Sequence, residues 1–463
     1  MVRILRRLSA LTLVATATLT ILWASQASTP APIDQVNVLL SRFMADANVV
    51  GVVAAVARGG ETIVQRAAGL ADRKAATPMT LDTSFRLGSV SKQFTASLVM
   101  RLVERQMVSP DDLVEKHYPE LPKKWRGVTV RQLLNHTSGI PDFTDTSPSN
   151  WPKSLPPAEM LGLVADDSLH FAAGSKYEYS NSNYMLLGLI AERHYAKPLA
   201  QILADELFTP LGLKTMRFCE DAYGANGQAR PYVRDNEAIE DAPYRSVAHS
   251  FGAGGICSTI ADVVRWNQSL HGGKVVSAAS YALMTTPSGA AAAAPERYGF
   301  GLGLRALAGR EMVYHGGLVP GFITVNGWIA AEQLSITVLT NTSPTPQMNA
   351  LFRDLTRIGL GQTITIWAPR EGAQPDERTL RQYAGTYTIQ VPGRPLGVRF
   401  WVENGQLVSQ ATGQNPAALR AVEGEHAFGS LNDWTVRFAF TMDQGKVTGF
   451  DFEQAGMKFK GTK

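Results

Sequence analysis

Cysteine is scarce in this chain of 463 residues, which contains only Cys219 and Cys257. Two cysteines cannot build a disulfide framework, so an apolar core must hold the fold together. One bridge between them is possible in an exported protein, but the sequence favours two unpaired thiols. The eight histidines are scattered singly, and neither His-Glu-x-x-His nor Cys-x-x-Cys occurs. The sequence therefore disfavours a metal hydrolase, and we expect no metal ion.

The chain also lacks a strong excess of charge. The formal charge of the whole chain is +4, and Arg3, Arg6 and Arg7 supply three of those positive charges near the N-terminus. Without residues 1–27, which hold no acidic residue, the charge is 4 − 3 = +1. No stripe of lysine and arginine follows, so we expect no nucleic-acid partner.

Residues 1–27 have the composition of a secretory signal. Three arginines precede an apolar run that ends at Trp23, and small residues follow as far as Ala27. This order predicts cleavage after Ala27, export to the periplasm or the medium, and no stable membrane span in the mature chain. An uncleaved membrane anchor is the alternative.

The rest of the chain divides at a segment rich in proline and glycine. Residues 28–368 contain a hairpin over 49–65, helices in the middle and further strands over 311–341, followed by a helix over 347–358. This pattern predicts an α/β (α+β) domain, a mostly antiparallel sheet flanked by helices with an inserted helical block. Residues 369–378 read as a linker. Residues 379–463 alternate in short strands, which predicts a small all-β domain, closed or nearly closed as a barrel.

The strongest local signal is Ser89-Val90-Ser91-Lys92. Apolar residues recur at three- and four-residue steps after Ser89, which predicts a helix that starts there and ends near Gln106. Lys92 then lies one turn from Ser89 on the same face. A serine hydroxyl needs a base to act as a nucleophile, and a partly desolvated lysine can be that base. The alternative is that Ser89 only caps the helix and Lys92 is solvated.

Two later segments have residue types that suit a binding site. Tyr179 and Asn181 lie in a Tyr- and Asn-rich loop before a helix expected over 185–194. The alternative there is helix capping by Ser182 or Asn183, with packed tyrosines. His315 is expected to end a strand and precede a turn. Residues 142–175 are loop-rich and are expected to form a wall of the site, with a plain surface loop as the alternative.

The order of these motifs resembles the penicillin-recognising serine hydrolases, in particular the class C β-lactamase-like family. That family carries Ser-x-x-Lys, then Tyr-x-Asn, then Lys-Thr-Gly or His-x-Gly, and this chain has Ser89 to Lys92, Tyr179 to Asn181 and His315 to Gly317 in that order. The resemblance covers residues 34–360. Segments 133–139, 253–255 and 298–303 are similar to the family too. The C-terminal domain resembles the lipocalin-like β-domains that follow some members.

The resemblance implies a role for each motif residue. Ser89 would attack a carbonyl while Lys92 and Tyr179 take its proton, and Tyr179 would then protonate the leaving group. Asn181 would bond the substrate or Lys92, and His315, Gly316, Gly317 and Leu318 would contact the substrate. The backbone N–H groups of Ser89 and Leu318 would form the oxyanion hole. No cofactor is implied, and the partner would be a small-molecule or peptide substrate.

The third motif departs from the Lys-Thr-Gly that is usual in true β-lactamases. His315 with an ordinary pKa of about 6.5 would be mostly neutral at pH 7, so penicillin binding should weaken as the pH rises past that value. An arginine from the loop-rich wall could supply the missing cation instead. Esterase, D-aminopeptidase, D-carboxypeptidase and weak β-lactamase activities stay open. The rival class is a non-catalytic binding or regulatory protein on a β-lactamase-like scaffold, with the β-domain as its ligand module.

Overall fold

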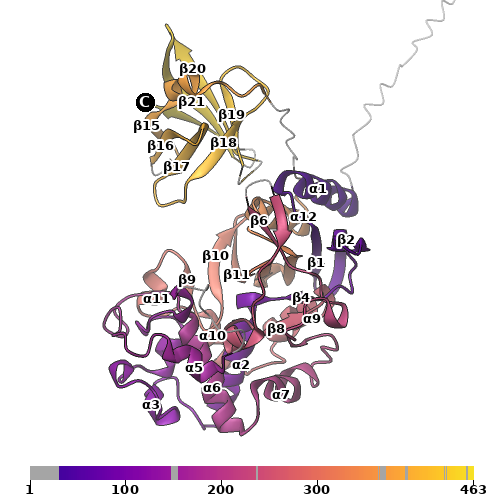
Figure 1. Ribbon diagram of the computed structural model, residues 1–463, viewed down its shortest axis with the longest axis vertical. Helices are drawn as coiled ribbons and strands as arrows, with labels where there is room; N and C mark the ends of the chain where they lie inside the picture. Colours follow the sequence, from indigo (N-terminus) through magenta and orange to yellow (C-terminus); the bar gives the residue numbers. More distant parts are fainter. Residues whose placement is uncertain are drawn as a thin grey trace, which may run out of the picture.

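The computed structural model describes residues 31–146, 155–235, 238–362, 364, 372–391, 395–431, 433, 435–454 and 457–463. A domain of mixed α and β structure and a smaller β domain follow one another along the chain (Figure 1). The expected signal, residues 1–27, and residues 369–371 of the expected linker lie outside the described ranges. Within those ranges, no helix combines the length and apolar character needed to cross a bilayer.

An eight-stranded antiparallel sheet organises the first domain, with the strand order β3-β2-β1-β13-β12-β11-β10-β9. The expected hairpin is β1 (Gly51–Arg58) and β2 (Glu61–Asp72). The other strands are β3 (Thr77–Pro78), β9 (Arg297–Tyr298), β10 (Gly303–Leu307), β11 (Arg310–Val319), β12 (Phe322–Ile329) and β13 (Leu334–Thr340). Both faces of β1 are buried in separate apolar clusters, which explains its nearly continuous apolar sequence.

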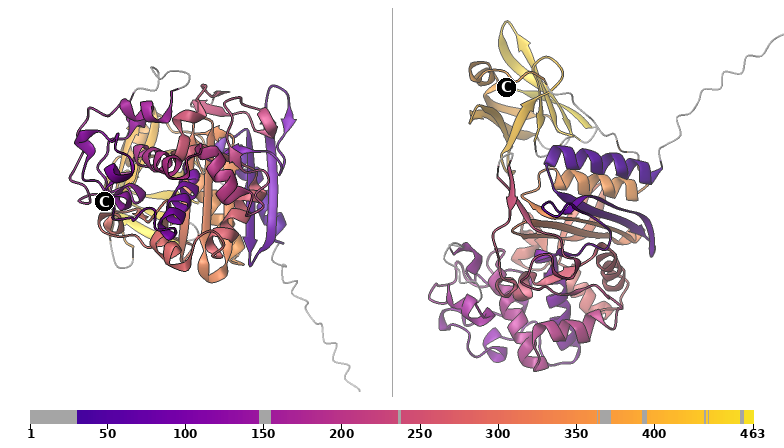
Figure 2. Two further views of the ribbon diagram at one scale, coloured as in Figure 1. Left: turned by 90° about the horizontal axis from the view of Figure 1, so that it is seen from below. Right: turned by 45° about the vertical axis from the view of Figure 1, so that its right-hand side comes forward.

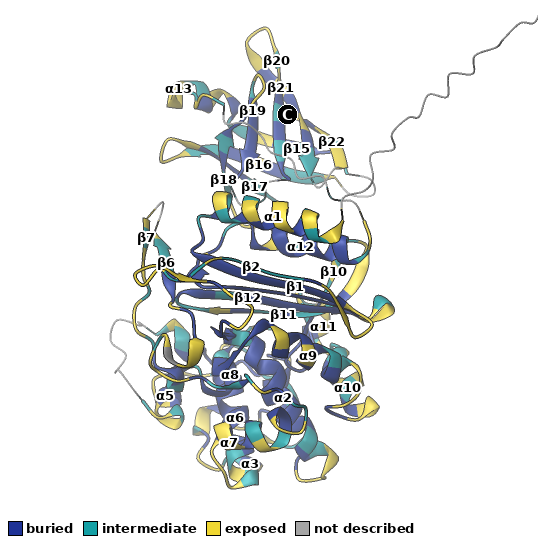
Figure 3. Ribbon diagram, turned by 90° about the vertical axis from the view of Figure 1, so that its right-hand side faces the viewer, coloured by how far each residue is buried: buried dark blue, intermediate teal, exposed yellow. Residues whose placement is uncertain are grey.

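Helices cover both faces of this sheet. On one face lie α1 (Pro32–Ala47) and α12 (Met348–Gly359), side by side in Figures 2 and 3. A block of helices lies below the other face (Figure 3). Its members are α2 (Lys92–Glu104), α3 (Val114–His117), α4 (Val130–Leu134), α5 (Pro157–Gly162), α6 (Asn181–Tyr195), α7 (Leu199–Leu203), α8 (Phe251–Gly254), α9 (Ile260–His271), α10 (Ala278–Thr285) and α11 (Ala290–Ala293). The fold is the α/β arrangement that the sequence predicts, a mostly antiparallel sheet flanked by helices with an inserted helical block.

Local sequence explains where the helices near the site begin. A 3-10 turn, η1 (Gly88–Ser91), precedes α2, so Ser89 lies just before the α-helix. Helix α4 begins with the capping box of Thr129 and Gln132. Helix α6 begins at Asn181, four residues earlier than expected, and its N-cap position, Ser180, has no side-chain capping bond. Neither Ser182 nor Asn183 is therefore the cap.

The two cysteines form a disulfide, which corrects the expectation of unpaired thiols. Cys219 follows β5 (Arg217–Phe218), and Cys257 lies in β8 (Ile256–Ser258). Because β5 and β8 pair, the two Cα atoms lie 5.0 Å apart although 38 positions separate them in the sequence. The same small sheet includes β4 (Phe85–Arg86), and a further one joins β6 (Tyr232–Asp235), β7 (Ala238–Asp241) and β14 (Thr342–Ser343).

One further expectation from the sequence is wrong. His315 does not end a strand, because β11 continues to Val319 and the turn comes at Pro320 and Gly321.

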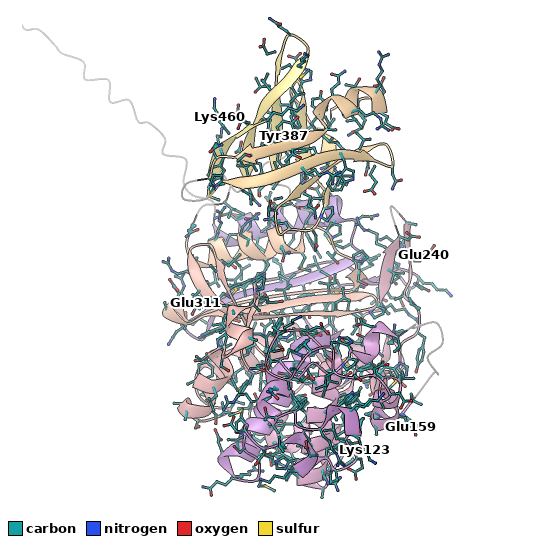
Figure 4. The ribbon with its side chains drawn as sticks, turned by 90° about the vertical axis from the view of Figure 1, so that its left-hand side faces the viewer. Lys123, Glu159, Glu240, Glu311, Tyr387 and Lys460 are labelled. Carbon is teal, nitrogen blue, oxygen red and sulfur yellow. A yellow bond between two sulfur atoms is a disulfide. The ribbon has the colours of Figure 1, made fainter. Side chains whose placement is uncertain are left out.

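The second domain is a closed barrel of eight antiparallel strands, which confirms the all-β, barrel-like domain that the sequence predicts. The strands are β15 (Gly385–Ile389), β16 (Leu396–Glu403), β17 (Gln406–Ala411), β18 (Ala417–Ala421), β19 (Ala427–Ser430), β20 (Arg437–Asp443), β21 (Lys446–Gln454) and β22 (Met457–Thr462), preceded by α13 (Glu377–Leu380). The sequence pattern misses β18 and β19. Aromatic rings fill the interior, among them Tyr387 (Figure 4), which packs against Phe400, Phe440 and Phe450.

The barrel lies beyond α1 and α12, on the opposite side of the sheet from the helical block (Figure 3). A partly buried ion pair joins Arg353 of α12 to Asp433 at 2.8 Å. The side chain of Gln347, the N-cap residue of α12, donates a hydrogen bond to the carbonyl of Leu431 at 2.6 Å. The contacts that join the two domains are therefore partly polar.

Candidate active site

A cleft of about 530 Å³ opens where η1 meets the exposed edge of β11. Ser89, Tyr179, His315, Gly316, Gly317 and Leu318, six of the eight residues that the sequence singles out, line it. Lys92 and Asn181 lie behind them and contact Ser89 or each other. The other lining residues are Glu296, Tyr298, Gly303, Tyr314, Ile323, Thr324, Val325, Thr345, Met348 and Asn349.

Ser89 and Lys92 are in hydrogen-bond contact. Lys92 Nζ lies 3.2 Å from Ser89 Oγ, 2.7 Å from Asn181 Oδ1 and 2.9 Å from the carbonyl oxygen of Ala253. The side chain of Lys92 has no solvent exposure. The alternative of a solvated lysine is therefore wrong.

The surroundings of Lys92 suit a neutral amine. Burial lowers the pKa of Lys92 to about 7, and the carboxylate of Asp142 opposes that shift. A neutral amine has two N–H donors and one lone pair. Asn181 Oδ1 and the Ala253 carbonyl can only accept, so they take the two N–H groups. The lone pair then faces the hydroxyl of Ser89, which is the arrangement that a general base requires.

Tyr179 lies next to this pair and stays protonated. Lys92 Nζ lies 4.7 Å from the centre of the Tyr179 ring. Burial raises the pKa of Tyr179 well above its usual value of about 10, although the Ser89 hydroxyl acts in the opposite direction. The phenol oxygen is buried beside the Ser89 hydroxyl, with which it is not in good hydrogen-bond geometry. The phenol is therefore a proton donor available to a ligand that binds at Ser89.

His136, to which the sequence reasoning gave no role, supports Tyr179. The two rings lie face to face at a tilt, with their centres 4.3 Å apart. The Ser180 N–H and the amide of Asn183 both lie 3.2 Å from His136 Nδ1, which therefore accepts. Burial lowers the pKa of His136 well below 6.5, and the charge of Lys92 adds to the effect. The imidazole is thus neutral and held in one orientation.

His315 is buried and neutral, which corrects the pH dependence expected from the sequence. Its Nδ1–H donates to the Gly316 carbonyl at 2.6 Å, so Nε2 accepts from the hydroxyl of Tyr298 at 2.7 Å. Burial lowers the pKa of His315 to about 3, helped by the charge of Lys92. The ring therefore does not titrate near pH 6.5, and penicillin binding gains no pH dependence from it.

Gly316, Gly317 and Leu318 form the part of β11 that β10 does not cover, because β10 pairs only as far as Tyr314. The loop before Ser89 packs closely on this edge. A Cβ on Gly88, whose φ is +53°, would lie 2.9 Å from the amide nitrogen of Leu318, and one on Gly317 would lie 2.0 Å from the Leu87 carbonyl oxygen. Glycine at both positions brings the backbone of Leu318 up to the loop that carries Ser89.

Asp142 fixes the orientation of Asn181. Its Oδ2 accepts from the backbone N–H of Asn181 at 3.0 Å and from the side-chain amide at 2.9 Å. With its NH₂ group held by the carboxylate, Asn181 must present its oxygen to Lys92. The sequence analysis missed Asp142, although it lies three residues after the family-like segment 133–139.

Some expectations for the cleft are not met. The loop-rich residues 142–146 and 155–175 do not line it, although Asp142 and Thr144 reach Asn181 from behind. No lysine or arginine is among the described lining residues, so the arginine that was left open as a partner for a carboxylate is not found there. The described residues contain no group of three or more His, Cys, Asp or Glu side chains that could hold a metal ion.

Comparisons with known proteins agree with this geometry. The curated D-aminopeptidase of Brucella anthropi is 30% identical over 305 residues, which is 63% of this chain and 56% of that protein. This chain thus spans about half the length of the curated relatives that it matches.

Two solved structures have similar folds. The D-amino acid amidase from Ochrobactrum anthropi SV3, complexed with L-phenylalanine amide, is 25% identical, with a TM-score of 0.63 over 71% of this chain and 97% of that one. The octameric penicillin-binding protein homologue from Pyrococcus abyssi shares the fold over 92% of this chain and 99% of that one, with a TM-score of 0.66 at 21% identity.

The family model described as Beta-lactamase matches residues 36–359, which include every motif residue of the cleft. Ser89, Lys92 and Tyr179, which lie within the matched residues, meet in the structure. The chain therefore belongs to the beta-lactamase family of hydrolases.

Proposed function

We propose that the protein is an exported serine hydrolase that cleaves D-amino acid amides, short D-peptides or small esters through an acyl-enzyme. The observation that carries the proposal is the contact of 3.2 Å between Ser89 Oγ and the buried amine of Lys92. Export is part of the proposal because of the signal-like residues 1–27.

In the proposed reaction, Ser89 Oγ attacks the substrate carbonyl as its proton moves to the neutral amine of Lys92. Backbone N–H groups of Ser89 and Leu318 stabilise the oxyanion. The phenol of Tyr179 donates its proton to the leaving amine or alkoxide as the bond to the acyl carbon breaks, and the proton on Lys92 restores the phenol. Water then attacks the acyl-enzyme, with Lys92 again as the base.

The charge of the cleft supports amides and esters over penicillins. A penicillin carries a carboxylate, and His315 is neutral and already bonded at both ring nitrogens. The described lining residues offer no lysine or arginine in its place. The similarity to a D-aminopeptidase and a D-amino acid amidase supports the same substrate class.

The rival proposal, a non-catalytic binding protein, has less support. Its ligand module would be the barrel, but aromatic side chains pack against one another through the barrel interior. A hollow of about 680 Å³ on the barrel is lined by charged side chains of β20 to β22 and contains no serine. The cleft at Ser89 is the better candidate for function.

The substrate class can be tested on wild-type enzyme expressed with its own residues 1–27 and recovered from the periplasm or medium. We expect kcat/KM for D-alanine p-nitroanilide to exceed that for the L-isomer at least about tenfold, a difference of ~1.4 kcal/mol in transition-state binding. At pH 8, kcat/KM for the best D-amide or ester should exceed kcat/KM for benzylpenicillin. A penicillin kcat/KM equal to or above the best D-amide or ester would contradict the proposed substrate class, and retention in the cytoplasm would contradict export.

Asp142→Asn should alter the pH profile because the carboxylate both orients Asn181 and raises the pKa of Lys92. We expect kcat to fall about tenfold and the acid limb of kcat/KM to move to lower pH, with the amine deprotonated more easily. The measurement is kcat/KM from pH 5 to 9.

Asp145→Asn is the matched control, because Asp145 is a nearby exposed carboxylate for which no bond to Asn181 is present in the structure. An acid limb that stays in place in Asp142→Asn, or that moves equally in Asp145→Asn, would show that Asp142 does not set the protonation of Lys92.

A further inference from the structure

Glu296 is the acidic residue of the cleft. Among the described lining residues it is the one carboxylate, and lysine and arginine are absent from them. The hydroxyl of Tyr314 donates a hydrogen bond to Glu296 Oε1, which holds this exposed carboxylate at the rim. The amine of Lys92 is fully buried behind Ser89, so it adds no positive charge to the accessible surface. The accessible surface of the cleft is therefore negative.

Glu296 precedes β9 and meets β11 at Tyr314, which separates it from the reacting carbonyl. Ser89 meets β11 at Gly317 and Leu318, whereas Glu296 is bound to Tyr314. Four residues of strand span about 13 Å. A ligand carbonyl at Ser89 and a charged group at Glu296 must therefore belong to different parts of the substrate.

Glu296 lies on the side of the cleft where the leaving group is expected. Tyr179, the proposed proton donor to the leaving group, has its ring 6.2 Å from Tyr298 and 6.4 Å from His315. Tyr298 is two residues from Glu296, and the charge of Glu296 contributes to raising the pKa of Tyr179. If Tyr179 protonates the leaving group as proposed above, that group lies on the side of the cleft that carries Glu296.

Two arginines lie near Glu296, and their positive charges partly offset its negative charge. The Arg305 guanidinium stacks 4.1 Å from the centre of the Tyr314 ring, behind the cleft surface. Arg297 is paired with Glu311 at 2.9 Å. Neither is a lining residue, so a ligand meets Glu296 first.

We propose that Glu296 makes the enzyme prefer substrates whose leaving group carries an ammonium and disfavour those whose leaving group carries a carboxylate. The proposal rests on the serine hydrolase proposed above and specifies its substrate class. An ammonium near Glu296 gains a favourable Coulomb interaction, whereas a carboxylate is repelled and has no cationic side chain to pair with.

Three substrates that share the D-alanyl acyl group and differ in the leaving group test this preference. D-alanylglycine, D-alanylglycinamide and the N-(2-aminoethyl)amide of D-alanine release a carboxylate-bearing, a neutral and an ammonium-bearing amine. We expect wild-type kcat/KM to rise in that order. In Glu296→Gln, the ratio of kcat/KM for the ammonium substrate to kcat/KM for the carboxylate substrate should fall at least about fivefold. This size is expected because the variant loses both an attraction and a repulsion at one exposed charge.

Glu311→Gln is the matched control. Glu311 (Figure 4) is also an exposed glutamate, it pairs with Arg297, and it is not a lining residue of the cleft. This variant should keep the wild-type ratio. The proposal is overturned if Glu296→Gln keeps that ratio too, or if both variants change it equally.

The outcome can be separated from that of the proposed function. If the wild-type enzyme cleaves none of the three D-alanyl compounds, the D-amide substrate class is wrong, but the compounds still serve as competitors of p-nitrophenyl acetate hydrolysis. Inhibition constants that favour the ammonium compound in wild type, and lose that preference in Glu296→Gln, support the role of Glu296. Equal inhibition constants for the three compounds in wild type, or no inhibition by any of them, would refute the role of Glu296.

Discussion

Ser89→Ala should abolish acyl transfer, because no other hydroxyl has an equivalent contact with the amine of Lys92 in the described part of the chain. We expect p-nitrophenyl acetate hydrolysis to fall to the uncatalysed rate and covalent labelling by a fluorophosphonate to disappear. The fold should persist, since Ser89 makes no side-chain cap of η1 or α2. Loss of one partly exposed hydroxyl costs at most about 1 kcal/mol of unfolding free energy.

Ser97→Ala is the matched control for this variant. Ser97 lies on α2, the helix that follows Ser89, is fully buried, and donates its hydroxyl to the Gln93 carbonyl at 2.7 Å, so Ser97→Ala removes the same chemical group close by. It should keep activity and labelling. Turnover of p-nitrophenyl acetate by Ser89→Ala at the wild-type rate, with labelling retained, would show that another residue is the nucleophile.

The sequence predicts the contact between Ser89 and Lys92 because both residues lie within one helical turn. Spacing alone places Ser89 and Lys92 on one face, but the apolar periodicity marks a different set of residues, and only the structure shows that Lys92 is buried. The meeting of this turn with Tyr179 and β11 is a long-range property. Only the family resemblance predicts this meeting, and in the structure these segments line one cleft.

The chemical state of the site residues could not be predicted from the sequence. The pKa of His315 depends on its burial and on the charge of Lys92, which is more than 200 positions away. The orientation of Asn181 depends on Asp142, which approaches from another loop. Such shifts arise from desolvation and neighbouring charge, and a motif specifies neither.

Weak local signals account for the errors in the secondary structure. β18 has the sequence Ala-Ala-Leu-Arg-Ala, which lacks β-branched residues and favours a helix by propensity. Its place between β17 and β19 in the closed barrel makes it a strand. The disulfide was missed for a related reason, because only the pairing of β5 with β8 brings Cys219 near Cys257.

Replacing Lys92 should have the second largest effect on activity. If the neutral amine is the base, Lys92→Ala should lower kcat/KM at least about a hundredfold. Lys92→Met should be equally impaired, although its unbranched apolar chain fills most of the same buried volume. Wild-type kcat/KM should rise as the pH increases through about 7, because the amine is active only when deprotonated and its pKa lies near that value.

Lys92→Arg distinguishes a base from a fixed positive charge. A guanidinium keeps the charge but does not deprotonate in this pH range, so it cannot accept the proton of Ser89. We expect this variant to be as inactive as Lys92→Met. The residual kcat/KM of both variants should no longer rise as the pH increases through about 7. Thermal unfolding of each variant confirms that a folded protein is being assayed. A small primary amine such as ethylamine should partly restore the Lys92→Ala enzyme by occupying the vacated space. Substantial activity in folded Lys92→Arg would instead mean that Lys92 acts through its charge and that Ser89 loses its proton to another group.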